Sequence, residues 1–320
     1  MANIFKRREA PIILFTIVLF CIFSLISSNF LKPDNLGLIL TQITTTGLIS
    51  IGMLMVILFG GIDLSVGSVL AVVATVVGML VNAGINPFVA ALIGMVVGAI
   101  CGAFNGLFIA WFNIPEIITT LATMFIFRGI AVAISGGEWV TNFPDSFNFF
   151  SQGKIIGIPV PIALFATGAI MFGYILSQTR FGRRVYAIGG NKEAAKLAGM
   201  STRKTKFLVY ISSGMLTSVA AVIYASQVGS IQASTAGSGI EFTVIAAVLV
   251  GGASIFGGVG TMLGTAFGVL LMGMIKNGLV LTQASVYWVD ATTGFILILA
   301  IIINTVQRSR NLASREGDLV

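Results

Sequence analysis

The charge of this 320-residue chain is concentrated in one segment, residues 180–206, that lies between long hydrophobic runs. The segment holds eight Lys and Arg residues and one acid, Glu193, so its net charge of +7 equals that of the whole chain. Lys and Arg collect on the cytoplasmic loops of proteins that cross a membrane several times. The segment is therefore predicted to be a cytoplasmic loop of a membrane protein.

The hydropathy of the rest of the chain agrees with this interpretation. Hydrophobic residues make up 57% of the sequence, charged residues only 9%, and the mean hydropathy is +1.03. Soluble domains carry roughly 25% charged residues, so a soluble fold would lack a polar surface. The apolar runs are long and continuous, whereas the strands of a membrane β-barrel alternate over about ten residues. We therefore predict an all-α, polytopic integral membrane protein with about ten transmembrane helices.

The apolar runs also predict where the chain crosses the membrane. An even number of spans places both termini on one side, and the basic residues at 6–8 and 308–315 then share the cytoplasmic side with segment 180–206. The glycines between 251 and 260 either break one helix or join two. We expect a single transmembrane domain over residues 1–320, with spans at 11–29, 37–59, 66–83, 87–111, 115–135, 159–178, 207–228, 242–257, 260–282 and 286–306.

Several classes of function are disfavoured by residues that the chain lacks. It has no His, the commonest general base and metal ligand. No two carboxylates are expected to face each other within the spans. The only Gly-Lys pair, Gly153-Lys154, is followed by Ile155, so the phosphate-binding G-x-x-x-x-G-K-[ST] motif is missing. We expect no catalytic, cofactor or metal site on this chain. Its pI of about 9.7 follows from topology and does not indicate a nucleic-acid partner.

Glycines repeat every four residues in two of the expected spans, from Gly94 to Gly106 and from Gly260 to Gly268. Such stripes let helix backbones approach closely in lipid. They serve either packing within one subunit, which we favour, or a contact between subunits.

A short helix is predicted inside the basic segment, where Glu193-Ala194-Ala195 is followed by Gly199. Alanine is a strong helix former, and a glycine commonly ends a helix in the left-handed conformation. An amphipathic helix between two spans suits docking into a groove of another protein, although a solvated loop helix without a partner has the same pattern.

The E-A-A-x-x-x-G pattern from Glu193 to Gly199 resembles the loop signature of permease subunits of bacterial ATP-binding-cassette importers. Residues 182–200, 60–68 and 245–252 are similar to the ribose, galactose and xylose branch of that family, and the resemblance extends from about residue 30 to 306. It implies an inner-membrane homodimer, an ATPase partner that holds ATP and Mg²⁺ (often as tandem nucleotide-binding domains), and a periplasmic or lipid-anchored sugar-binding protein. By this resemblance, coupling to the ATPase would involve Arg183, Arg184, Lys192, Glu193, Ala194, Ala195 and Gly199.

Polar residues in or beside the expected spans are candidates for a passage or a gate. Asp63 follows two glycines, where its carboxylate would accept the N–H of Ser65 or Val66 as a helix cap. Arg128 lies about 10 Å inside a span, and it either extends to the interface or serves a cavity with Glu138 or Glu241 as partner. Three neutral candidates are Gln42, Thr45 and Asn105, although hydrogen bonding between helices is the commoner explanation of such residues.

The predicted function is therefore that of a permease subunit in an ATP-driven monosaccharide importer, not an enzyme. Related small polar cargoes, such as a nucleoside or a furanosyl signal molecule, remain alternatives. A secondary carrier driven by ions is disfavoured, because such carriers place ionisable groups in mid-membrane. The sequence names neither the sugar nor the choice between a homodimer and a heterodimer with a related permease.

Overall fold

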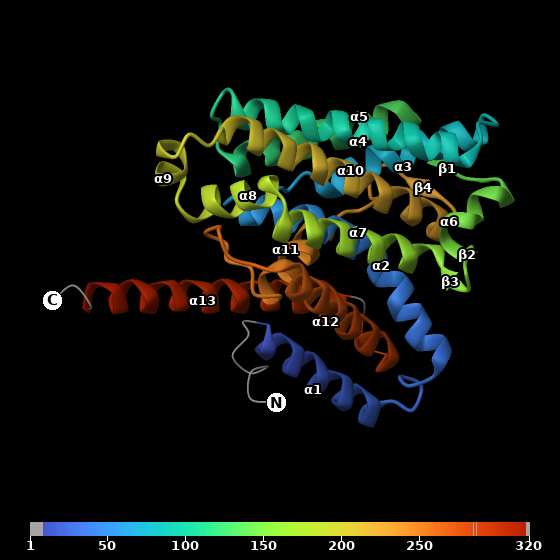
Figure 1. The fold of residues 1–320 in the computed structure, drawn as a ribbon. Helices are drawn as coiled ribbons and strands as arrows, with labels where there is room; N and C mark the ends of the chain where they lie inside the picture. The colour runs from blue at the N-terminus through green and yellow to red at the C-terminus, as the bar shows by residue number, and fades with distance from the viewer. Residues whose placement is uncertain (1–8, 284, 286, 318–320) are drawn as a thin grey trace.

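The computed structural model describes residues 9–283, 285 and 287–317, and this part of the chain is almost entirely helical (Figure 1). The strands are two residues long and form two antiparallel pairs, β1 (Trp139–Val140) with β4 (Ile231–Gln232) and β2 (Lys154–Ile155) with β3 (Ile158–Pro159). Thirteen α-helices occur in the described part: α1 (Ala10–Ile26), α2 (Pro33–Leu58), α3 (Val66–Asn82), α4 (Pro87–Ala110), α5 (Glu116–Ser135), α6 (Phe149–Gln152), α7 (Val160–Gln178), α8 (Arg180–Gly190), α9 (Lys192–Leu197), α10 (Thr202–Val228), α11 (Ile240–Val250), α12 (Met262–Leu281) and α13 (Tyr287–Gly317).

The helices have the length and composition of a polytopic membrane protein. Seven of the described helices, α2, α4, α5, α7, α10, α12 and α13, are long and apolar enough to cross a membrane, while α1, α3 and α11 are shorter apolar helices. Their positions follow the expected spans. The prediction of an all-α, polytopic membrane fold is confirmed.

One boundary differs clearly from the prediction. The span expected at 242–257 is an 11-residue helix, α11, that ends at Val250. Gly252 has a φ of +90°, in the region that glycine enters without strain, and the chain then runs as a loop until α12 begins at Met262. The glycines of this region therefore join two helices.

The glycine stripes pack helices of this chain against each other. A methyl group on Gly102 of α4 would lie 2.2 Å from the carbonyl oxygen of Tyr210 in α10, and one on Gly268 of α12 would lie 2.0 Å from that of Ala247 in α11. Neither pair of helices leaves room for a side chain there. The predicted packing within one subunit is confirmed.

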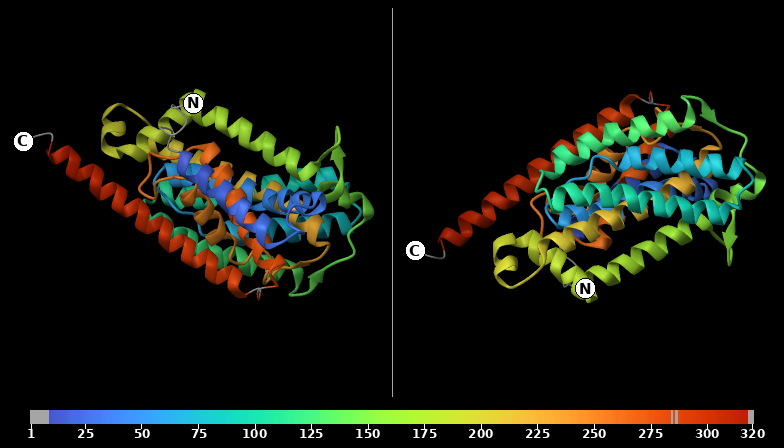
Figure 2. Two further views of the ribbon diagram at one scale, coloured as in Figure 1. Left: turned by 90° about the horizontal axis from the view of Figure 1, so that it is seen from below. Right: turned by 90° about the horizontal axis from the view of Figure 1, so that it is seen from above.

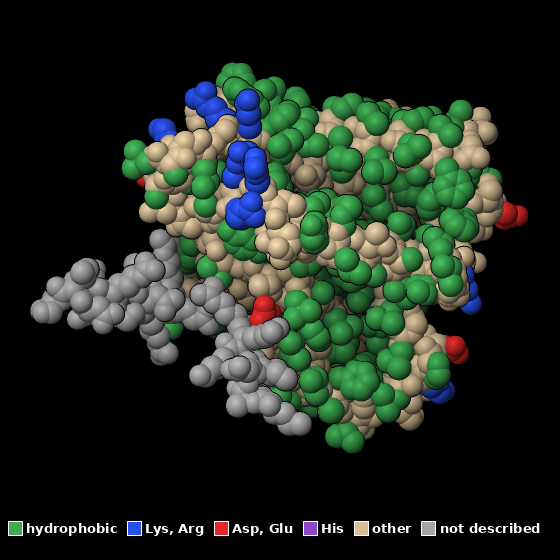
Figure 3. Space-filling view, in the orientation of Figure 1, with side chains coloured by type: hydrophobic (Ala, Val, Ile, Leu, Met, Phe, Trp, Pro, Cys, Tyr) green, Lys and Arg blue, Asp and Glu red, His purple; other side chains and the backbone are tan. Residues whose placement is uncertain are grey.

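The described molecule has two distinct ends (Figures 1 and 2). The basic end carries α8 and α9, together with the start of α1 and the end of α13. The strand end carries α6 and the strand pairs. On the face shown in Figure 3, many Lys and Arg side chains gather at the basic end.

Residues 233–239, which we call the re-entrant segment, run from the strand end back into the helix bundle. They follow strand β4, yet the carbonyl oxygen of Gly237 lies 2.5 Å from the position that a methyl group on Gly67 would occupy, in the first turn of α3. Helix α11 then starts inside the bundle. At 1.5 Å per residue it is about 16 Å long, roughly half the hydrocarbon thickness of a bilayer.

Candidate functional site

A cavity of about 390 Å³ opens among α2, α10, α11, α12, α13 and the re-entrant segment, and we call it the central cavity. Its volume falls within the roughly 300–1,000 Å³ of small-molecule sites. Hydroxyl and amide side chains supply much of the polar lining, and two ionisable groups, Lys276 and Asp290, are also part of it. The neutral polar lining residues are Gln42, Thr45, Thr46, Tyr224, Gln227, Thr235, Ser238, Thr243 and Thr293.

This lining suits a neutral ligand that carries many hydroxyl groups. Hydroxyls and amides both donate and accept hydrogen bonds, so they match a polyol without requiring a net charge on the ligand. Of the predicted passage residues, Gln42 and Thr45 lie here, and the Thr45 hydroxyl is buried without a hydrogen-bond partner among the described residues.

Arg128 holds the re-entrant segment in place from the neighbouring helix α5. Its guanidinium donates hydrogen bonds to the carbonyl oxygens of Ala233, at 2.9 Å, and Ala236, at 2.6 Å. The side chain is thus directed into the protein, where it interacts electrostatically with the buried carboxylate of Glu241. Arg128 does not itself line the central cavity, but it fixes a segment that does.

Asp63 and Asn105 belong to a separate, buried hydrogen-bond network. The Asp63 carboxylate accepts the backbone N–H of Ser65 at 2.9 Å and the Ser65 hydroxyl at 2.6 Å. The same hydroxyl accepts an N–H from the Asn105 amide at 2.8 Å. The predicted bond from the Ser65 N–H to Asp63 is present, but Ser65 and not Asp63 is the N-cap residue of α3. Both residues lie outside the lining of the central cavity.

An ion pair that sequence reasoning missed joins α10 to the start of α5. The Lys206 ammonium of α10 bonds the Glu116 carboxylate in the first turn of α5, and it also lies 5.4 Å from the centre of the Phe59 ring. Lys206 was counted only as part of the basic segment. Ninety residues separate the two partners, so no local pattern indicates the pair.

The predicted helix in the basic segment is present as α9, with a cap at each end. The Asn191 side chain accepts the N–H of Ala194 at 2.9 Å. Gly199 has a φ of +75°, its N–H bonds the Lys196 carbonyl, and the N–H of Met200 bonds the Ala195 carbonyl. This pair of bonds is the Schellman motif that left-handed glycines make at helix ends.

Most side chains of α8 and α9 are exposed on the surface. Ala195 is buried, while Leu197 is 90% exposed at the tip of the segment. Helix α8, which the sequence did not predict, buries Val185 and Ile188 and leaves its basic side chains outside. The other predicted coupling residues are exposed: Arg183, Arg184, Lys192, Glu193, Ala194 and Gly199.

Comparison with known proteins assigns the chain to a family. A family profile described as "Branched-chain amino acid transport system / permease component" matches residues 35–301. The chain belongs to this permease family. The permease is 38% identical to the ribose import permease protein RbsC of Bacillus subtilis over 289 residues, which cover 90% of this chain and 89% of that protein.

Two further relatives cover nearly the whole permease. The L-arabinose ABC transporter permease protein AraH of Azospirillum brasilense is 34% identical over 308 residues, 96% of this chain and 91% of its own. The autoinducer 2 import system permease protein LsrC of Klebsiella pneumoniae is 33% identical over 308 residues, 95% and 88% of the two chains. No solved structure matches the permease.

The family confirms the predicted resemblance to importer permeases. The permease is a multi-pass membrane component of an ABC importer and is not itself catalytic. The structure shows where the individual coupling and passage residues lie, but their roles stay predictions.

Proposed function

We propose that the permease carries a monosaccharide, such as a ribose-like pentose or a hexose, inward across the bacterial inner membrane through the central cavity. The observation that carries this proposal is the lining of that cavity by hydroxyl and amide groups. The relatives named for ribose and L-arabinose import support the same class of cargo.

In this proposal the permease crosses the membrane ten times, with both termini in the cytoplasm. The spans are α1 to α5, α7 and α10 to α13, and the short α11 completes its crossing together with the re-entrant segment. The basic end faces the cytoplasm because Lys and Arg are retained there. The strand end then faces the periplasm, where a periplasmic or lipid-anchored sugar-binding protein delivers the cargo.

The energy comes from a separate ATPase that holds ATP and Mg²⁺ and docks on α9. A second copy of the permease, or a related permease, completes the transmembrane unit. ATP binding can shift the permease between outward and inward states only if the ATPase contacts differ between those states. The exposed Leu197 and the capped, rigid end of α9 provide such a contact surface.

A furanosyl signal molecule is a second candidate cargo, favoured by the likeness to an autoinducer 2 permease. A nucleoside shares the hydroxyl groups that the cavity suits. An ion-coupled carrier is supported less well, because Lys276 and Asp290 of the cavity are exposed side chains near the ends of their helices.

The test is uptake by proteoliposomes that contain the permease, its ATPase and its binding protein. We expect radiolabelled ribose or arabinose to accumulate with ATP and to be unaffected when the proton gradient is dissipated. The variant Glu193→Lys should reduce uptake without lowering the melting temperature of the purified permease. Uptake that follows the proton gradient in place of ATP would refute the proposal.

A further inference from the structure

We infer that the end of α8 and the loop of residues 251–261 form a joint that transmits movement of the docking surface to α11, with Tyr186 as its positioning residue. The inference rests on the proposed function, since it takes α8 and α9 as the surface on which the ATPase acts.

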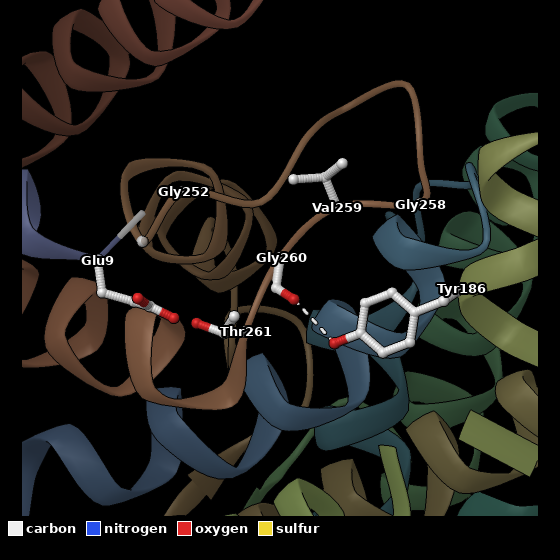
Figure 4. A pocket seen from close by; sticks show the side chains of 8 residues that line it. Glu9, Tyr186, Gly252, Gly258, Val259, Gly260 and Thr261 are labelled. Atoms are coloured by element: carbon white, nitrogen blue, oxygen red, sulfur yellow. Dashed lines mark hydrogen bonds between the residues drawn. The ribbon is translucent and has the colours of Figure 1, made fainter. Parts of the chain in front are cut away.

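Two hydrogen bonds tie the loop to α8 on one side and to the end of α2 on the other. The Tyr186 hydroxyl of α8 donates to the carbonyl oxygen of Gly260 at 2.8 Å, as drawn in Figure 4. The backbone N–H of Gly258 donates to the carbonyl oxygen of Leu58, the last residue of α2, at 2.8 Å. Burial raises the pKa of the Tyr186 phenol, so its hydroxyl stays protonated and able to donate at physiological pH.

Where α8 and the loop meet, glycines bring the two backbones into direct contact, with no side chain between them. A methyl group on Gly189 would lie 1.8 Å from the Leu58 carbonyl oxygen. Gly258 has a φ of +72°, and a methyl group there would lie 2.6 Å from the Cα of Gly190. Because the backbones of α8 and the loop touch directly, a displacement of α8 must move the loop or break these contacts.

The loop continues directly into two walls of the central cavity. It joins α11 to α12, and these helices are in close contact, since a methyl group on Gly264 would lie 2.0 Å from the Gly251 carbonyl oxygen. Both helices line the cavity, α11 with Thr243 and α12 with Lys276. The two helices therefore move as one unit when the loop moves.

Space for such a movement exists beside the joint. A hollow of about 130 Å³ is lined by Tyr186, Glu9 and the loop. Figure 4 shows Tyr186 approaching Gly260 from one side, while Glu9 and Thr261 lie on the other. A shift of the loop into this hollow must either carry the end of α2 with it or break the hydrogen bond from Gly258 to Leu58.

The test measures whether the cavity responds to the ATPase through Tyr186. Ser238, an exposed residue of the cavity lining, is changed to Cys in a chain whose two native cysteines, Cys21 and Cys101, are replaced by Ala. The complex with its ATPase is reconstituted in nanodiscs. A charged methanethiosulfonate reagent then labels Ser238→Cys without nucleotide and with ATP plus vanadate.

We expect the labelling rate to change about tenfold with nucleotide, and the change to shrink to about twofold in the Tyr186→Phe variant. Loss of one hydrogen bond shifts a two-state equilibrium by about fivefold. The matched control is Tyr174→Phe, at an exposed tyrosine of α7, which should keep the full change. Melting temperatures of both variants equal to that of the parent would show that neither is simply unfolded.

The inference would be overturned if the labelling rate responded to nucleotide equally in Tyr186→Phe and in the parent. It would also be overturned if the labelling rate of the parent did not change with nucleotide. In both cases ATP-driven uptake by the parent would leave the proposed function standing. A parent that takes up no monosaccharide with ATP would contradict the proposed function itself, and the joint with it.

Discussion

Gly199 offers the sharpest test of the docking helix, because its role in this structure is purely conformational. Its φ is +75°, and a methyl group placed on it would meet nothing within 4 Å in this chain. An L-residue in the left-handed region costs about 1–2 kcal/mol. The helix it ends, α9, has only six residues, which is too short to be stable on its own. The cost therefore falls directly on the docking surface.

We expect Gly199→Ala to reduce the population of the capped α9 by about 5–30-fold, the factor that corresponds to 1–2 kcal/mol. Asn tolerates the left-handed region better than other residues, and β-branched residues tolerate it least. Transport per ATP hydrolysed in proteoliposomes should thus fall in the order Gly, Asn, Ala, Val at this position. Affinity for the purified ATPase should fall in the same order.

The order separates a backbone effect from a steric one. If a side chain at this position simply collided with the ATPase, the small Ala would be tolerated best and the larger Asn and Val would both fail. An Ala variant that transports better than the Asn variant would therefore refute the conformational argument. Circular dichroism of each purified variant provides the control for folding of the whole chain.

Three further outcomes follow from the contacts described above. Arg128→Met leaves two loop carbonyls without their donor, at about 1–3 kcal/mol each, so it should lower the melting temperature and reduce uptake, whereas a Lys variant should lose less of both. Gly102→Val places its side chain against a backbone carbonyl and should abolish stable expression, while Gly129→Ala, which meets nothing within 4 Å, should express normally. Glu116→Gln and Lys206→Met should show a coupling of about 1 kcal/mol in a double-mutant cycle of thermal stability; additive effects would mean that the ion pair contributes nothing.

Much of the architecture could be predicted because it depends on local properties. The apolar runs predict where the helices lie, and Gly199 ends α9 through its own backbone, so the all-α polytopic fold and the end of α9 were predicted correctly. The glycine stripe of α4 was also correct, since spacing by four places its members on one helix face, whereas Gly260 of the second stripe lies in the loop before α12. Helix α11 was predicted too long, because its end depends on how Gly252 fits the loop to α12.

The functional site was less predictable because it depends on how the helices face one another. Gln42 and Thr45 line the central cavity while Asp63 and Asn105 lie in a buried network, yet all four were grouped as passage candidates. Helix α8 was missed because its basic residues dominate the sequence pattern, and the few apolar residues between them did not indicate a buried face. The bond between Tyr186 and Gly260 joins residues 74 positions apart, and nothing near either one indicates it.

The weak attachment of α13 has a consequence for how this protein must be handled. Only 11% of its apolar part, residues 287–306, is buried, although Asp290 and Thr293 of this helix line the central cavity. The position of this cavity wall therefore depends on the molecules that surround the outer face of α13. Acyl chains of a bilayer press differently from a detergent micelle, so cargo entry measured in detergent will describe a different opening from the one in the cell.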